Sequence, residues 1–317
     1  MFKSDVLCIG SATVDNFLSV EKDLSKIELG DKVLVKSIVK DNGGGANNTS
    51  VALKKLGLSV KILTKLGEDH DGDFINAQLR KEKIRNICRK RSKKHTDYST
   101  IISSKKGKDR IILVHKGAST DLTINDFRKM DLKAKWIYLA SLTGKSFQTA
   151  KEIIEYAEKK KIHLLFNPSL YLAKKGKNYL YKLLQASSVL ILNKKEAQSL
   201  LGRKLEKISL LKGLYHLGPQ LVVITNGKDK VYAYDGQTMY SLTPPDVKVT
   251  NTAGAGDAFA SAFLAGIIGG YHFADCLRLG VLNSTSVIQQ VGTKNGLLSA
   301  HEIAHLLKTR KIKVVEK

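Results

Sequence analysis

Short apolar runs alternate with amphipathic stretches of helical length along most of this chain. Such an alternation predicts an α/β protein with a mostly parallel central sheet and helices on both of its faces, in three layers. Uninterrupted apolar runs such as LVVIT suit strands that are covered on both sides. The expected strands are 6–9, 60–63, 136–139, 162–166, 189–192 and 221–224, and the expected helices are 45–57, 71–83, 146–160 and 194–201.

Two segments, 16–42 and 96–117, interrupt this alternation. The first contains two short apolar runs and no good helix pattern. The second contains the strand-like runs YSTIIS and RIILV, joined by the turn-like residues 105–108. A strand insertion in an α/β core is a candidate lid over a ligand site. Because no linker, low-complexity segment or repeat divides the chain, we expect residues 1–317 to form a single domain with lid insertions at these two segments.

Composition narrows the class of protein. No stretch reaches the ~18 uninterrupted apolar residues of a membrane span, and the N-terminal MFKSDVLCIG passes directly into a strand-like run, unlike a signal peptide. The cysteines Cys8, Cys88 and Cys276 form no CxxC pair, as expected of a cytoplasmic protein. The net charge is +24, but lysine is scattered and the densest basic run, 89–94, lacks interleaved aromatics. We therefore expect a surface that attracts phosphorylated metabolites, and neither a nucleic acid nor a membrane as partner.

Two glycine-rich segments each precede the expected start of a helix. In DNGGGANNTSVALKKLG (41–57), three consecutive glycines allow the backbone to approach a ligand closely. In NTAGAGDAF (251–259), Gly254, Ala255 and Gly256 can curl so that their backbone N–H groups converge beside the positive end of a helix dipole. Such an arrangement suits the negative charge that develops during phosphoryl transfer.

Asp257 lies directly after the second glycine turn. Two interpretations are open: the residue caps the following helix, or it is the base that takes a proton from an attacking hydroxyl group. A carboxylate that served only as a cap would weaken the adjacent anion site. The sequence therefore favours the catalytic interpretation.

Polar residues also follow two of the expected strands. Asn193 and Glu196 lie three residues apart at a helix start, where they would either form a capping box or hold a hydrated Mg²⁺ near phosphates. Thr225 and Gly227 end the run LVVITNG, at the strand end where open α/β sheets bind ligands.

Taken in order, these elements resemble the PfkB/ribokinase family of carbohydrate and nucleoside kinases over nearly the whole chain. GGGANN is similar to the first family signature, GG-x-x-x-N, through Gly43, Gly44 and Asn48. KLGEDHDGDFI resembles the element G-x-D-x-x-G, and NKKE resembles N-x-x-E. NTAGAGDAF resembles the second signature, which is usually DTTGAGDAF.

The resemblance implies a ribokinase-like fold and transfer of the γ-phosphoryl group of ATP to a hydroxyl group of a sugar. Asp257 would be the general base, and the backbone of residues 253–256 would form the anion hole. Lids of this family often mediate dimerisation, so a homodimer through the lid is expected. The other implied roles are substrate binding by Asp15, Gly43, Gly44 and Asn48, nucleotide binding by Asn193, Thr225, Gly227 and Asn283, and binding of Mg²⁺ through water by Glu196.

The chain departs from the family at positions that concern cofactor and substrate. Asn251 and Ala253 replace an aspartate and a threonine in a segment that helps related kinases to hold a monovalent cation, so strong potassium dependence is not expected. Lys230 replaces a glycine of the nucleotide loop. No ribose-contacting glutamate follows the expected strand 136–139. A nucleoside kinase of adenosine or cytidine type and a sugar-phosphate kinase are therefore kept as alternatives.

A different enzyme class is suggested by HEIAH (301–305), which spells the zinc-protease motif HExxH. Only twelve residues follow it, too few for a cleft-forming domain. A nucleic-acid-binding module is the other remote alternative. The two glycine signatures outweigh both.

Overall fold

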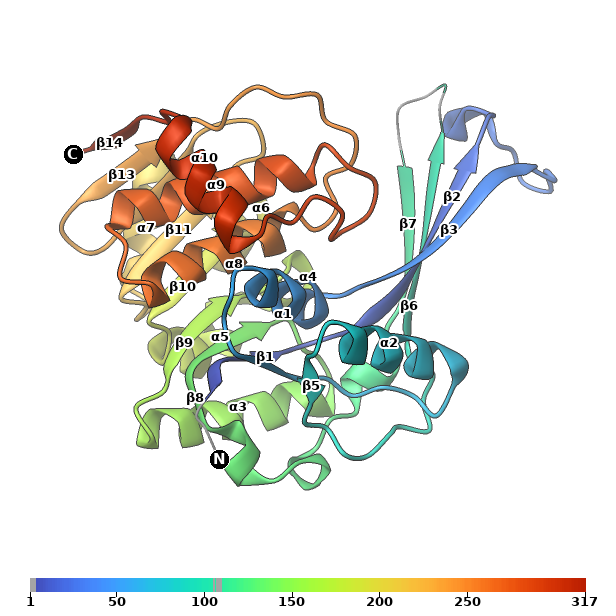
Figure 1. Cartoon of the computed structure of the whole chain (residues 1–317), viewed down its shortest axis with the longest axis horizontal. Helices are drawn as coiled ribbons and strands as arrows, with labels where there is room; N and C mark the ends of the chain where they lie inside the picture. Colours follow the sequence, from blue (N-terminus) through green and yellow to red (C-terminus); the bar gives the residue numbers. More distant parts are fainter. Residues whose placement is uncertain (1–3, 105, 107–109) are drawn as a thin grey trace.

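The computed structural model describes residues 4–104, 106 and 110–317 of the chain (Figure 1). Most of its strands form one large sheet, which has helices packed on both faces. The strands of this sheet are β1 (Ser4–Ile9), β4 (Val60–Leu63), β5 (Arg85–Asn86), β8 (Ala134–Ala140), β9 (His163–Asn167), β10 (Val189–Asn193), β11 (Leu221–Thr225), β12 (Val231–Tyr234), β13 (Met239–Leu242) and β14 (Val314–Glu316).

The large sheet is mostly parallel, as the alternating pattern predicts. Its strand order is β14-β13-β12-β11-β10-β9-β8-β1-β4-β5. Every neighbouring pair from β5 to β11 is parallel, whereas β12, β13 and β14 extend the sheet in antiparallel fashion. Because the carboxyl ends of parallel strands share one edge, the loops after β1, β8, β9, β10 and β11 come together there.

Helices cover the two faces of this sheet and bury one apolar stripe each. In the helix spanning Lys145–Lys159, for example, Phe147, Ile153 and Ile154 are buried while Glu158 is exposed. One face is covered by α1 (Gly45–Lys55), α2 (His70–Lys81), α8 (Ala255–Ile268) and α9 (Phe273–Val287), with α10 (Ala300–Thr309) against α9. The other is covered by α3 (Lys145–Lys159), α4 (Leu170–Ala173), α5 (Gly176–Gln185), α6 (Lys194–Leu201) and α7 (Lys207–Tyr215). Short 3₁₀ turns occur at Leu24–Lys26, Ala118–Thr120, Ile124–Asp126 and Lys129–Leu132.

The two segments that interrupt the alternating pattern supply a second, smaller sheet. It consists of β2 (Thr13–Val20), β3 (Val35–Gly43), β6 (Asp97–Ser104) and β7 (Arg110–His115), in the order β3-β2-β6-β7. We call this sheet the lid. Figure 1 shows it standing beside the helix-covered body, next to α1 and α2. Of the turn expected at 105–108, residues 105, 107 and 108 lie outside the described residues.

Candidate active site

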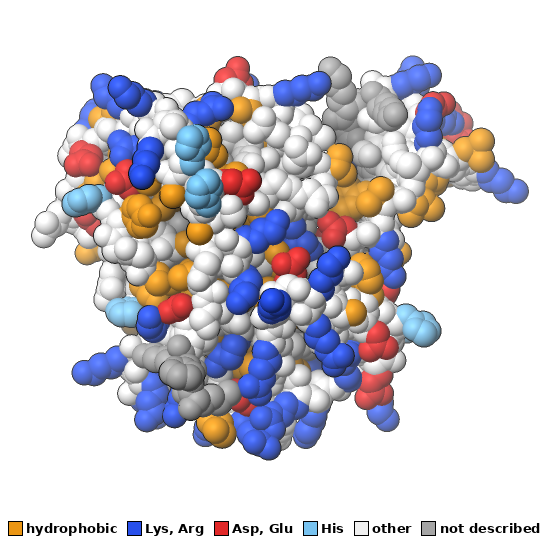
Figure 2. Space-filling model, viewed as in Figure 1, with side chains coloured by type: hydrophobic (Ala, Val, Ile, Leu, Met, Phe, Trp, Pro, Cys, Tyr) orange, Lys and Arg blue, Asp and Glu red, His pale blue; other side chains and the backbone are white. Residues whose placement is uncertain are grey.

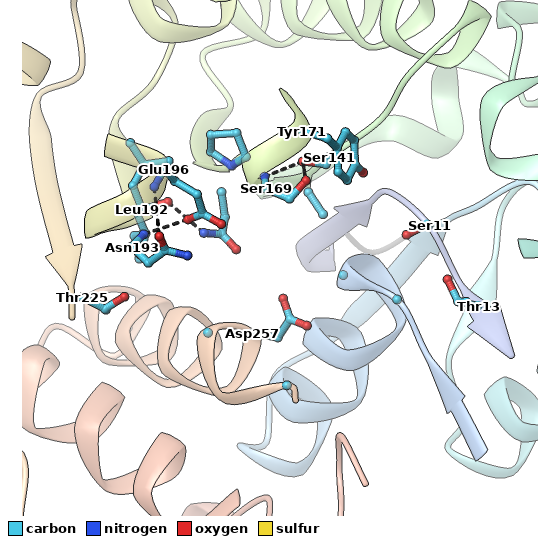
Figure 3. Close-up of a pocket in the computed structure, with 18 of the residues that line it drawn as sticks. Ser11, Thr13, Ser141, Ser169, Tyr171, Leu192, Asn193, Glu196, Thr225 and Asp257 are labelled. Atoms are coloured by element: carbon cyan, nitrogen blue, oxygen red, sulfur yellow. Dashed lines mark hydrogen bonds between the residues drawn. The ribbon is translucent and has the colours of Figure 1, made fainter. Parts of the chain in front are cut away.

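A cavity of about 310 Å³ opens at the carboxyl edge of the large sheet (Figure 3). It lies between the start of α8 and the ends of β8 to β11, where the topology brings the strand-end loops together. Of the residues selected from the sequence, the cavity is lined by Gly44, Asn193, Glu196, Thr225, Gly254, Gly256 and Asp257.

The glycine turn has the backbone that its sequence predicts. Gly254 is the N-terminal flanking residue of α8 and has φ of 78°, a left-handed conformation that favours glycine. A Cβ atom at this position would lie 2.4 Å from the carbonyl oxygen of Thr293. Glycine is therefore required both by the backbone angle and by the close approach of the segment around Thr293.

Asp257 is not the cap of α8. The capping position is occupied by Gly254, which makes no side-chain capping bond, and Asp257 lies within the first helical turn. Its carboxylate points from the helix start into the cavity (Figure 3). The cap interpretation of Asp257 is therefore wrong.

Asn48 holds the Asp257 carboxylate in place. The Asn48 Nδ2 atom donates to Oδ2 of Asp257 at 2.8 Å, and Oδ1 of Asn48 accepts from the Thr293 hydroxyl at 2.9 Å. Asn48 is buried in α1, and its amide is held between Asp257 and Thr293. The resemblance assigns Asn48 to substrate binding, and in the structure its amide holds Asp257.

Burial raises the pKa of Asp257 to about 6, although the Asn48 hydrogen bond acts in the opposite direction. The negative charge of Asp15 adds to the rise. A carboxyl group with a pKa near neutrality, at a helix start and inside a cavity, has the properties of a general base.

Asp15, Gly43 and Gly44, to which the family resemblance assigns substrate binding, lie at the base of the lid. Asp15 of β2 is buried, accepts a hydrogen bond from the Ser99 hydroxyl and pairs across the sheet with Asp41. A Cβ atom on Gly43 would lie 1.9 Å from Oδ2 of Asp15, so only glycine allows this carboxylate to sit there. Gly44 has φ of 94°, and a Cβ atom there would lie 2.6 Å from the Ser11 carbonyl oxygen.

Asn193 and Glu196 form a capping box at the start of α6. The Asn193 N–H group donates to Glu196 Oε2 at 2.7 Å, and the Glu196 N–H group donates to Asn193 Oδ1 at 2.9 Å. The capping box, one of the two roles expected for this pair, is therefore present. Glu196 nevertheless also faces the cavity (Figure 3). Burial raises the pKa of Glu196 to about 7, and the charge of Asp257 contributes to this rise, so the cavity has two carboxyl groups that favour a cation between them.

Thr225, Gly227 and Asn283, the other residues to which the resemblance assigns nucleotide binding, have different surroundings. Thr225 ends β11 and lines the cavity. Gly227 follows in a turn with φ of 58° and is not among the lining residues. Asn283 is fully buried in α9, where Nδ2 donates to the Ala258 carbonyl oxygen at 2.9 Å and Oδ1 accepts from the Leu298 N–H group at 3.0 Å. Since both ends of its amide are engaged inside the protein, we assign Asn283 a structural role and no nucleotide contact.

Two residues of the lid, one in β7 and one directly after it, reach the site. Arg110 of β7 donates to Oδ1 of Asn251 at 3.1 Å and to the Thr252 hydroxyl at 2.9 Å, which ties the lid to the segment that leads into the glycine turn. Lys116 lines the cavity and forms an ion pair of 3.1 Å with the buried Asp97. Although burial lowers the pKa of Lys116, the charge of Asp97 raises it above its ordinary value.

Several lining residues carry no motif and were missed in the sequence. Ser141 follows β8, Asn167 ends β9, and Ser169 and Tyr171 lie at the start of α4. The Ser169 hydroxyl donates to that of Ser141 at 2.8 Å (Figure 3). The signal available for them was their position after expected parallel strands.

The features that suggested a zinc protease or a nucleic-acid-binding module have ordinary structural surroundings. Glu302 of the HExxH segment accepts hydrogen bonds from the backbone and hydroxyl of Ser299, as part of the capping box of α10. His301 and His305 are exposed on the same helix. Figure 2 shows Lys and Arg side chains spread over the visible face, with acidic side chains among them. Within the described residues, no helix combines the length and apolarity needed to cross a membrane.

A mostly parallel sheet, a lid, and a glycine turn with a carboxylate beside it place this chain in the class of α/β proteins that have a small-molecule site at the carboxyl edge of the sheet. The pfkB family of carbohydrate kinases matches residues 3–300. The chain therefore belongs to the pfkB family of carbohydrate kinases, enzymes that transfer a phosphoryl group to a hydroxyl group.

Individual relatives agree with this assignment. The chain is 26% identical to a 5-dehydro-2-deoxygluconokinase of Clostridium tetani, over 97% of this chain and 94% of the relative. It is also 26% identical to a ribokinase of Bacillus subtilis, over 96% and 99% of the two chains. The structure of an Arabidopsis thaliana ribokinase, complexed with ribose and ATP, has a TM-score of 0.82 at 20% identity and covers 97% of this chain and 99% of its own. These likenesses confirm the expected family and the ribokinase-like fold.

Proposed function

We propose that this protein is an ATP-dependent sugar kinase in which Asp257 is the general base. The observation that carries the proposal is the Asp257 carboxylate itself, which faces the cavity at the start of α8, is held by Asn48 and has a pKa of about 6. An ordinary surface aspartate would need neither the buried partner nor the glycine turn beside it.

The proposed reaction uses the two sides of the cavity. Asp257 accepts the proton of the acceptor hydroxyl while the hydroxyl oxygen forms a bond to the γ-phosphorus of ATP. The bond from this phosphorus to the oxygen that bridges it to the β-phosphate breaks, and ADP leaves. The backbone N–H groups at residues 253–256 stabilise the charge on the transferred group. Asp15 at the lid base binds hydroxyl groups of the acceptor, while Thr225 and Gly227 lie along the nucleotide.

The carboxyl groups fit a magnesium ion that accompanies ATP. Mg²⁺ is held in such sites by one or two carboxylates together with phosphate oxygens and water. Glu196 faces the cavity opposite Asp257, and its pKa is raised mainly by burial and also by the charge of Asp257. A cation nearby would stabilise the ionised form of this carboxyl group. We propose that Glu196 would hold Mg²⁺ through water, and that the bound ion would supply positive charge beside the phosphates of ATP.

We propose that a monovalent cation has little influence on this enzyme. Asn251 offers an amide where relatives of the family offer a carboxylate, and its Oδ1 atom already accepts from Arg110 and, at 2.9 Å, from the Ala253 N–H group. A neutral oxygen with two donors is a poor ligand for potassium.

An ATP-consumption screen tests the proposed activity and identifies the acceptor. Pentoses, hexoses, keto-sugar acids, nucleosides and sugar phosphates are offered with ATP and Mg²⁺, and ADP formation is followed. We expect turnover with a sugar. Turnover with a nucleoside or a sugar phosphate alone would select one of the alternatives, and ATP turnover with none of them would contradict the kinase proposal.

Asp15→Asn is expected to weaken binding of the acceptor. Because the substitution removes the charge that would receive hydrogen bonds from sugar hydroxyl groups, the acceptor KM should rise about 10- to 100-fold. The KM of ATP should stay near the wild-type value. Steady-state kinetics with each substrate varied in turn measure both, and an unchanged acceptor KM would remove Asp15 from the substrate site.

Activity is expected to fall as pH drops below about 6, because only the ionised form of Asp257 can accept a proton. The measurement is kcat/KM of the acceptor against pH. Since Glu196 titrates near 7, the residual activity of Glu196→Gln is profiled in parallel and should keep the limb near 6. Asn48→Ala should move this limb to higher pH, because the Asn48 hydrogen bond lowers the pKa of Asp257. A limb at about 4, the value of an ordinary carboxyl group, would contradict the assignment.

We propose that the protein forms a homodimer through the lid. Apolar side chains on two lid strands are exposed, among them Ile38 at 67% and Leu113 at 57%. A face of this kind is costly to leave in water, and a second lid is its proposed cover. Size-exclusion chromatography with light scattering should give a dimer for the wild type and a monomer for the double variant Ile38→Lys, Leu113→Lys. A monomeric wild type at micromolar concentration would contradict the proposal.

A further inference from the structure

A second cavity, of about 340 Å³, lies at the sheet edge formed by β4 and β5. It is bounded by the carboxyl ends of these strands, by α2 and by the segment after β5, which includes part of the basic run 89–94. The active-site cavity is lined by residues after β1 and at the ends of β8 to β11, whereas this one lies at β4 and β5, and the two cavities share no lining residue among those described. The position is thus distinct from the active site.

The lining of this second cavity is cationic. Arg80, Arg89, Lys90 and Arg91 all line it, and none of its described lining residues is acidic. Arg89 forms an ion pair with the buried Asp131 at 2.9 Å, and Arg91 forms one with Asp73 at 3.0 Å. Within the described part of the chain, Arg80 and Lys90 form no ion pair. Two positive charges are therefore not neutralised by a protein partner.

The floor of the cavity is polar and incompletely paired. Thr64, directly after β4, is only 1% exposed, and its hydroxyl has no hydrogen-bond partner among the described residues. Beside it, Asn86 is fixed by the backbone, since Oδ1 accepts from the Cys88 N–H group at 3.1 Å and Nδ2 donates to the Thr64 carbonyl oxygen at 3.0 Å. A buried, unpaired hydroxyl is costly, and Thr64 is one of the residues that line this cationic cavity.

We propose that this cavity is a binding site for a phosphorylated small molecule, separate from the substrate and nucleotide sites. Arg80, Lys90 and the guanidinium of Arg91 would bind the phosphate oxygens, and the Thr64 hydroxyl would donate the hydrogen bond that it otherwise lacks. Guanidinium and ammonium groups gathered around a polar floor recognise a phosphate group, and the size of the cavity admits a small organic phosphate.

An occupant of this cavity would also contact Arg91, which is connected to the lid by hydrogen bonds. Arg91 Nη1 donates to the Gly67 carbonyl oxygen at 2.9 Å, and the Gly67 N–H group donates to the Thr96 hydroxyl at 2.9 Å. Thr96 directly precedes strand β6 of the lid. Because a phosphate would compete with Gly67 for the Arg91 guanidinium, we expect its binding to change the acceptor KM.

Calorimetric titration of the full chain with inorganic phosphate and with glycerol 3-phosphate tests the site. A non-hydrolysable ATP analogue and Mg²⁺ are kept at saturation so that the active site is filled. Wild-type protein should bind both probes with one site per chain, and the double variant Arg80→Gln, Lys90→Gln should bind about tenfold or more weakly. Both substituted side chains lack ion-pair partners in the described chain, so the variant should fold, which its melting temperature checks.

Two further variants make the test specific. Lys159→Gln, Lys160→Gln removes the same charge from the exposed end of α3 and should leave the affinity unchanged, whereas Thr64→Val should weaken binding. If both double variants weaken phosphate binding equally, the attraction is unspecific and the site is overturned. The site is also overturned if the ATP analogue abolishes phosphate binding. The link to the lid is tested by measuring the acceptor KM with and without saturating phosphate. If phosphate changes this KM equally in the wild type and in Arg80→Gln, Lys90→Gln, the link to the lid is overturned.

Discussion

Asp257→Asn is expected to lose nearly all turnover, about 10²- to 10⁴-fold in kcat, while keeping its affinity for the nucleotide. The asparagine has the same shape and can still accept the hydrogen bond from Asn48, but it cannot take a proton from the acceptor hydroxyl. The measurement is kcat by coupled ADP detection together with calorimetric binding of an ATP analogue.

A stability measurement separates this effect from unfolding. Burial raises the pKa of Asp257 in the folded protein to about 6, so its contribution to stability is present at low pH and is lost as pH rises through 6. At neutral pH the ionised carboxylate is therefore unfavourable, and Asp257→Asn should melt at the same temperature as the wild type or higher. Near-normal turnover in a folded Asp257→Asn protein would refute the proposed mechanism.

Gly254→Ala is expected to reduce kcat by about 10²- to 10³-fold, the loss seen when an anion hole is damaged. The added Cβ atom would lie 2.4 Å from the Thr293 carbonyl oxygen, and the backbone is in the left-handed region. The turn must therefore shift, which misplaces the N–H groups at residues 255 and 256. Thr293 also holds Asn48, so the shift would reach Asp257.

Gly270→Ala is the matched control for this prediction. It makes the same substitution between α8 and α9, at a backbone φ of 72° that is also left-handed, but there a Cβ atom would meet nothing within 4 Å and the residue does not line the cavity. Its loss of kcat should be much smaller than that of Gly254→Ala. Equal losses in the two variants would indicate that the backbone path of the turn has no special role in catalysis.

The sequence predicts the layers of this fold better than its edges. Runs such as 221–224 are uninterrupted, apolar and buried on both faces, so their composition indicates a central strand without ambiguity. Strands β12 and β13 are short and partly exposed, and β14 near the chain end pairs only with β13. Their stability comes from pairing with the sheet, which no local pattern reveals.

Sequence alone predicts those parts of the site where the backbone geometry requires glycine. It does not predict contacts between side chains that come from distant segments. Gly43 and Gly254 are specified by contacts that any Cβ atom would violate, so their signature is visible in one chain. The Asn48–Asp257 bond joins residues 209 positions apart, and its partner choice depends on the fold. The resemblance alone assigned Asn283 to the nucleotide, and its two buried backbone partners cannot be read from the neighbouring sequence.

The central claim is that this chain moves the γ-phosphoryl group of ATP to a hydroxyl group with Asp257 as base. Its most direct test is to incubate the protein with ATP labelled in the γ-phosphate, Mg²⁺ and the acceptor chosen by the screen, and to follow the label. We expect the label in the phosphorylated acceptor, one for each ADP formed, with wild-type protein but not with Asp257→Asn. Label that appears only in inorganic phosphate, or transfer that persists in Asp257→Asn, would contradict the claim.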